Sequence, residues 1–166
     1  RAFVMTDPEV TTCTVQLYNV LEGRPVAATV PQFRQEMVES LGTRILMRRC
    51  DERVKKGQAS FRGAKAGIDD FFREATMVSA AASGEPEDWD KMFEEVIVEM
   101  RRACEQGFTE RELDLIKKQV VASAERGVRV EPTMNSSSVL STLTSAVNDG
   151  EPVLSAQQYL DLVNEL

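Results

Sequence analysis

The segment Glu105–Lys118, EQGFTERELDLIKK, constrains the fold most, because it ends one helix and begins another within a few residues. Gly107 suits the position just past a helix end, where a positive φ is common. Thr109 is a candidate cap for the next helix, and Glu112, three residues later, completes a capping box. Phe108 stands directly before the cap, where it can pack on Leu113. A connection this short predicts two helices that are neighbours in the fold.

Composition limits the class of protein. The chain has 166 residues, enough for one domain or a close pair of subdomains. Its net charge of −7 argues against non-specific binding to nucleic acid or to an anionic membrane surface. Its apolar runs fall short of the roughly 18 residues that a membrane span needs. We therefore expect no nucleic-acid partner and no membrane span. The chain starts abruptly at Arg1 and has the character of an excised fragment, which leaves its location open between bacterial periplasm and cytoplasm.

Hydrophobic periodicity predicts strands first and helices afterwards. Alternating apolar residues indicate strands, and apolar residues repeating at three and four positions indicate helices. The elements expected in the first half are a short strand at Ala2–Met5, a strand at Val10–Val20, a helix at Pro31–Lys55, and two antiparallel strands at Gln58–Gly67 and Phe71–Ser83. The turn between the last two is expected at Gly67–Asp70.

Helices are expected to fill the second half of the chain. The helix that begins at Trp89 has the clearest period, and its predicted inward residues include Trp89 and Cys104. A second helix follows Thr109, a helix rich in Ser and Thr runs to about Val147, and Ser155 caps the last one. Because strands and helices form separate blocks, the predicted class is α+β, with helices packed on one face of an antiparallel sheet.

The sequence contains no histidine, and this excludes several kinds of catalytic site. Neither a Ser-His-Asp nor a Cys-His arrangement can form, and no imidazole is present to bind zinc. The three cysteines are widely spaced and form no CxxC pair, so we interpret them as small buried apolar residues. The carboxylate pairs Asp69-Asp70 and Glu94-Glu95 are interpreted as a solvated turn and a solvated helix face. We therefore assign no catalytic residue and no metal ligand.

Several motifs together resemble the insulinase/pitrilysin family of zinc metallopeptidases. Gly107–Leu113, followed by Lys117-Lys118, matches a family pattern in which a helix ends at Gly-Phe-Thr and the next begins with Glu-x-Glu-Leu. Further landmarks follow the family order: Val4–Glu9, Phe72–Ala75 before the small-residue strand Met77–Ser83, a Trp-led helix, Glu131–Thr133 and Gly150–Pro152. The resemblance covers nearly the whole chain.

The resemblance implies that the chain is part of a larger enzyme. Members of the family contain repeated α+β domains of the metallopeptidase LuxS/MPP-like fold, in the order strand-helix-strand-strand-helices, facing each other around a substrate chamber. Residues 1–166 are then a single non-catalytic domain that lacks its closing strand. The implied partners are other domains of the same polypeptide and a peptide substrate. The chain itself would hold no cofactor, and zinc would lie in the catalytic domain of the parent protein.

The resemblance also suggests one binding segment. Gln58, Ala59, Ser60 and Phe61 correspond in position to a strand that takes the N-terminal end of the substrate by backbone pairing in insulysin-type members. Pairing of this kind needs an open edge and little side-chain identity. The alternative interpretation of this segment is an ordinary sheet strand without a binding role. The alternative for the whole chain is a structural subunit or domain of a processing or assembly complex without protease activity.

Overall fold

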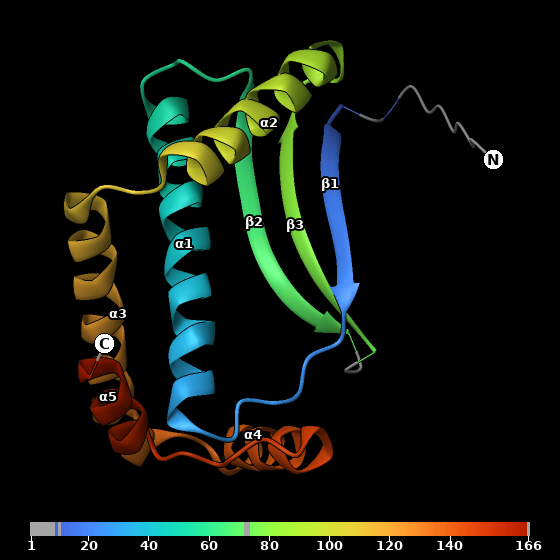
Figure 1. Cartoon of the computed structure of the whole chain (residues 1–166). Coiled ribbons are helices and arrows are strands. Elements are labelled where there is room, and N and C mark those ends of the chain that lie inside the picture. Colours follow the sequence, from blue (N-terminus) through green and yellow to red (C-terminus); the bar gives the residue numbers. More distant parts are fainter. Residues whose placement is uncertain (1–8, 10, 72–73, 166) are drawn as a thin grey trace. The chain divides into compact units, whose positions relative to one another are not determined.

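The computed structural model describes residues 9, 11–71 and 74–165. Within them the order of elements is strand, helix, two strands and then helices (Figure 1). The strands are β1 (Cys13–Glu22), β2 (Phe61–Phe71) and β3 (Ala75–Gly84), and the α-helices are α1 (Val30–Lys55), α2 (Trp89–Gln106), α3 (Glu110–Val130), α4 (Ser136–Asp149) and α5 (Ala156–Asn164). There are also two short 3-10 helices: Pro86–Asp88 precedes α2, and Glu131–Thr133 follows α3. The predicted α+β class is confirmed, whereas the strand expected at Ala2–Met5 lies outside the described residues.

The chain divides into two compact units. The first, here called the sheet unit, contains Arg1–Gly23 and Gly42–Phe108, and so holds the three strands, the second half of α1 and α2. The second, the helical unit, contains Arg24–Leu41 and Thr109–Leu166. The chain passes between the units at three places: after Gly23, after Leu41 within α1, and after Phe108 in the connection between α2 and α3.

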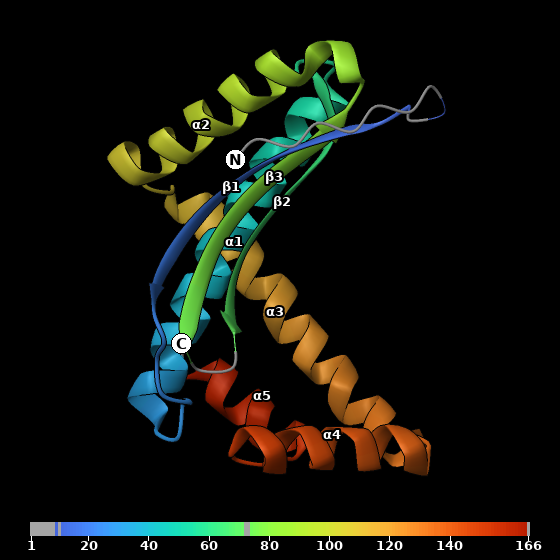
Figure 2. The same ribbon diagram turned by 90° about the vertical axis from the view of Figure 1, so that its right-hand side faces the viewer.

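The three strands form one antiparallel sheet in the order β1-β3-β2. Along β1, Cys13, Val15 and Leu17 pack against the core while the residues between them are exposed, as the alternating pattern predicts. Ala80 and Ala82 of β3 continue this inner face. Figure 2 shows β3 between β1 and β2, with the second half of α1 behind the strands.

The sheet unit has a core between this inner face and its two helical segments. It consists of Cys50 from α1, Phe61 from β2, Ala80 and Ala82 from β3, and Met92 and Val96 from α2. Because the side chains of Ala80 and Ala82 are short, α2 approaches the end of β3 closely. A Cβ atom placed on Gly84 would lie 2.7 Å from the Met92 sulfur and 3.2 Å from the Ser60 carbonyl oxygen.

The turn between β2 and β3 differs from the prediction. The strands continue in register through the expected turn, with Asp69 opposite Met77 and Asp70 opposite Thr76. The hydroxyl of Thr76, which is buried, donates a 2.6 Å hydrogen bond to the Asp70 carboxylate. This hydrogen bond between the strands holds Asp70 in β2. The pair Asp69-Asp70 therefore belongs to β2 and does not form the turn that was predicted.

The connection between α2 and α3 has the predicted local geometry. Gly107 has φ 68°, which favours glycine. The Thr109 hydroxyl accepts from the Glu112 backbone N–H, and the Glu112 carboxylate accepts from the Thr109 N–H at 2.8 Å, which confirms the capping box. Phe108 lies under the Arg49 guanidinium, 4.9 Å from the ring centroid. The glycine in the middle of α1, Gly42, faces this ring; a Cβ there would lie 3.5 Å from it.

Two residues predicted to point inward are exposed instead. Trp89 is 56% exposed, and Cys104 is also exposed. Trp89 and Cys104 lie near the two ends of α2, whereas its buried residues Met92, Val96 and Glu99 lie between them. A helical period identifies the face of a helix but does not show how far its neighbour reaches.

The helical unit is built on the pair α3 and α5. Its buried residues include Ile116, Val120 and Ala124 of α3 and Val163 of α5. The first turns of α1 also belong to this unit, because Phe33 meets Tyr159 edge to face, with ring centroids 5.9 Å apart. Ser155 caps α5 as predicted, through a capping box with Gln158.

Candidate functional site

The candidate functional site is the outer face of the sheet. Since Cys13, Val15, Ala80 and Ala82 point to the core, their neighbours along each strand point the other way. We call this surface the open face: Thr14, Gln16 and Tyr18 on β1, Ser79, Ala81 and Ser83 on β3, and Gly63, Lys65, Gly67 and Asp69 on β2. Within the described part of the sheet unit, α1 and α2 both pack against the inner face.

The centre of the open face is low, and its borders are taller. The register places Gly63 beside Ser83 and Gly67 beside Ser79, so two strands present only hydrogen atoms or hydroxymethyl groups there. A Cβ on Gly67 would lie 3.7 Å from the Ser79 hydroxyl, which confirms that these positions share one face. Tyr18 stands at the β1 border, 54% exposed. Such a surface lets an extended backbone or a flat side chain come close to the sheet.

The predicted binding segment lies next to the open face, at the start of β2. Gln58, Ala59 and Ser60 precede the strand, and Phe61 is its first residue. The Phe61 side chain is buried in the core. The Ser60 N–H donates to the Glu95 carboxylate at 3.2 Å, and the Gln58 carbonyl oxygen accepts from the Arg53 guanidinium at 3.0 Å. The Gln58 N–H also donates to the Arg53 carbonyl oxygen at 2.9 Å, so three backbone groups of the segment are already bonded to the protein.

A charged cluster holds this segment in place. Arg53 of α1 pairs with Glu95 at 3.3 Å and with Glu99 at 3.1 Å, both on α2. Glu95 is thus part of an ion-pair cluster rather than of a solvated helix face. Glu99 is 5% exposed, so its charge depends on Arg53 for compensation. Burial and the nearby Glu99 carboxylate raise the pKa of the Cys50 thiol to about 11, which keeps it protonated and unreactive near neutral pH.

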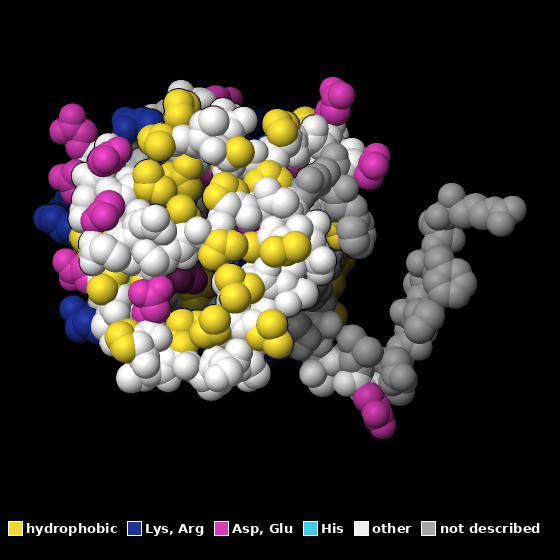
Figure 3. Space-filling model, turned by 90° about the horizontal axis from the view of Figure 1, so that it is seen from below, with side chains coloured by type: hydrophobic (Ala, Val, Ile, Leu, Met, Phe, Trp, Pro, Cys, Tyr) yellow, Lys and Arg dark blue, Asp and Glu magenta, His cyan; other side chains and the backbone are white. Residues whose placement is uncertain are grey.

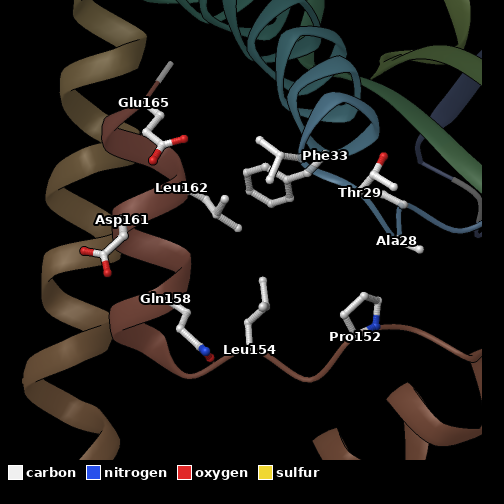
Figure 4. Close-up of a pocket in the computed structure, with 11 residues that line it drawn as sticks. Ala28, Thr29, Phe33, Pro152, Leu154, Gln158, Asp161, Leu162 and Glu165 are labelled. Atoms are coloured by element: carbon white, nitrogen blue, oxygen red, sulfur yellow. The ribbon is translucent and has the colours of Figure 1, made fainter.

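An apolar hollow lies within the helical unit. It has a volume of about 350 Å³ and is lined by residues that precede or begin α1, by the segment before α5 and by α5 itself. Figure 4 shows Phe33, Leu154 and Leu162 pointing toward one another across it, whereas the Asp161 carboxylate points away. Asp161 accepts a 2.8 Å hydrogen bond from Gln157. The hollow is apolar and offers an anchor for a hydrophobic side chain, not a reactive group.

In the part of the chain that the structure describes, no group of three or more Cys, Asp or Glu side chains is arranged to hold a metal ion. None of the helices in the described ranges has the length and apolar character of a membrane span. The open face itself offers a low surface with hydroxyl groups. The outer edges of the sheet offer backbone groups with which an added strand could pair.

The site residues predicted from the sequence do not include Thr14, Gln16 and Tyr18. The available signal is the run of small residues in β3. The structure shows that the run serves two faces: Ala80 and Ala82 lie under helices, whereas Ser79, Ala81 and Ser83 belong to the open face.

Comparison of the structure with solved structures finds strong similarity to protease chains. The first half of the periplasmic protease PqqL from Escherichia coli matches with a TM-score of 0.85 and 17% identity, over 95% of this chain and 34% of that one. Whole PqqL matches with a TM-score of 0.84 and 16% identity, over 94% of this chain and 17% of that one. A predicted insulinase family protease from Yersinia pestis matches with a TM-score of 0.76 and 13% identity, over 96% of this chain and 34% of that one.

These similarities establish the fold. No protein-family model and no curated protein sequence matches the chain. At 13 to 17% identity the solved structures share the backbone arrangement of nearly the whole chain. The chain spans about a third of the length of the first half of PqqL and of the Yersinia pestis protease chain, so in those proteins the same fold is one part of a longer polypeptide.

Proposed function

We propose that this chain is a non-catalytic domain of an insulinase-type zinc metallopeptidase and that its open face forms part of the wall around the peptide substrate. The observation that supports this proposal is the fold, which matches parts of the periplasmic protease PqqL and of a predicted insulinase family protease over at least 94% of the chain. The motif order around Gly107–Leu113 supports the same assignment independently of the structure.

The zinc and the general base are proposed to come from another domain of the same polypeptide. A zinc peptidase needs a metal-bound water and a base to activate it. This chain has no histidine with which to bind the metal. Its own contribution would be to shape the chamber and to hold the peptide, which requires surface and strand edges rather than reactive side chains.

Peptide binding is proposed to combine the open face with the start of β2. In the described residues, β2 pairs only with β3, so its other edge can accept an added strand. The predicted segment Gln58, Ala59, Ser60 and Phe61 leads into that edge. Since Arg53 and Glu95 already bond to the backbone of Gln58 and Ser60, pairing with a peptide would begin at Phe61 and continue along β2.

The test uses the full-length protein and a bulky substitution on the open face. Ala81→Trp fills the low centre, and Ser123→Trp, on the exposed surface of α3, is the matched control. We expect A81W to lower kcat/KM for peptides about tenfold, mainly through KM, because chamber contacts supply binding rather than chemistry.

Three results would count against the proposal. Equal kinetics in A81W and S123W would show that the open face does not contact the substrate. An effect on kcat alone would place the surface in another role. A full-length protein with neither zinc nor activity would favour the structural-subunit alternative.

A further inference from the structure

Helix α4 has an unusual surface for an exposed helix. Of its 14 residues only Ala146 is buried. Leu140 is 65% exposed and Val147 74%, and Val139 and Leu143 are exposed as well. Isolated apolar residues on a surface are ordinary, but four on one short helix form a patch.

The charge pattern gives a second, independent indication. There is no charged residue between Glu131 and Asp149, although 28% of the chain is charged. The remaining α4 side chains are mostly Ser and Thr, which are small and can bond to their own helix, as the Thr142 hydroxyl does with the Ser138 carbonyl oxygen at 3.1 Å. In Figure 3, hydrophobic side chains are spread over much of the visible face. Depletion of charge is the mark of the buried centre of an interface.

We propose that the α4 surface, defined by Val139, Leu140, Leu143 and Val147, is a permanent docking surface for a further domain of the same polypeptide. This inference rests on the proposed function, in which such a domain exists. The similar solved structures support it, because there this fold makes up about a third of the first half of PqqL and of the Yersinia pestis protease chain.

The absence of charge from residues 132–148 distinguishes a linked domain from an independent partner. A free partner gains association rate from complementary charge, which this stretch does not provide. A domain on the same polypeptide is held at a high effective concentration and needs no such steering. The surface that docks on α4 is therefore expected to be apolar, uncharged and always present, unlike an exchangeable peptide.

The test is photo-crosslinking in the full-length protein. Leu140 is replaced by the benzophenone amino acid p-benzoylphenylalanine, and Lys118, exposed on α3, carries the same group in the control. We expect the probe at 140 to join to residues outside 1–166 of the same molecule, at a yield independent of protein concentration. The control should show little crosslinking.

Other outcomes overturn the inference. A dimeric product whose yield rises with concentration would mean that α4 binds a second copy. Capture of added peptide, no crosslink at all, or a gene product with no residues outside 1–166 would each reject a docked domain.

Hydrogen exchange of α4 provides a measurement without any substitution. We expect backbone amides of residues 139–147 to exchange at least about tenfold more slowly in the full-length protein than in the 166-residue chain, because docking suppresses local opening. Equal exchange would contradict the proposal. Peptidase activity is assayed separately on the same sample. If the α4 amides are protected but the protein has no peptidase activity, the docking surface is supported and the peptidase role is rejected. If the protein is active but the α4 amides are not protected, the peptidase role is supported and the docking surface is rejected.

Discussion

The three cysteines lie in three different environments, although nothing in their sequence spacing distinguishes them. Cys50 is buried, Cys13 is half-buried and Cys104 is exposed. The prediction of small buried residues is therefore right for Cys50 and wrong for Cys104. Position in the fold, rather than residue type, decides which thiol is reactive.

The raised pKa of Cys50 predicts a loss of stability in alkaline solution. In the folded protein, burial and Glu99 raise the thiol pKa from its ordinary value of 9.0 to about 11. Between these values the unfolded chain loses the proton while the folded chain keeps it, so the free energy of unfolding falls as pH rises. The expected loss from this group is on the order of 2 kcal/mol.

Urea unfolding of Cys50→Ala at about pH 8 and about pH 11 tests this expectation. The variant should be less stable than wild type at the lower pH, because it leaves a small cavity, but should lose less stability on going to the higher pH. Cys104→Ala is the control and should keep the wild-type pH dependence. Parallel pH profiles for all three proteins would show that the Cys50 thiol is not perturbed.

At the scale of elements, local signals in the sequence identified most helices and strands. The Thr109 and Ser155 capping boxes and the breaks at Gly107 and Gly150 involve residues close together in the chain, and the structure contains all of them. The turn after β2 was misplaced because glycine and aspartate usually indicate turns. Here Asp70 is held in the strand by Thr76, a cross-strand partner that is visible only once the register is known.

The close contact between α2 and β3 predicts opposite effects for two glycine substitutions. Gly84→Ala should destabilise the protein by about 1–3 kcal/mol, because the added methyl group meets the Met92 sulfur and the Ser60 carbonyl. Gly127→Ala, within α3 and with no described atom within 4 Å of the new Cβ, should stabilise it by up to about 1 kcal/mol.

Thermal and urea unfolding of both glycine variants provide the comparison. The two substitutions add the same methyl group, so general effects of glycine removal cancel between them. A G84A variant as stable as G127A would mean that α2 does not approach β3 as closely as the structure shows.

At the scale of the whole molecule, the sequence identified the fold more completely than the site. The motif order around Gly107–Leu113 pointed to a fold that the solved structures share over nearly the full chain. The open face depended on pairing three strands whose register is set by distant residues, such as Gly63 beside Ser83. The single domain expected over residues 1–166 and its missing closing strand stay predictions; by its contacts the chain divides into two compact units.

The central claim is that this chain serves a zinc peptidase without carrying its catalytic centre. The most direct test measures zinc content and peptide hydrolysis on two purified samples, the full-length protein and the 166-residue chain. The account predicts about one zinc ion per full-length molecule together with activity, and neither in the 166-residue chain. Hydrolysis by the 166-residue chain, or a full-length protein that lacks both zinc and activity, would contradict it.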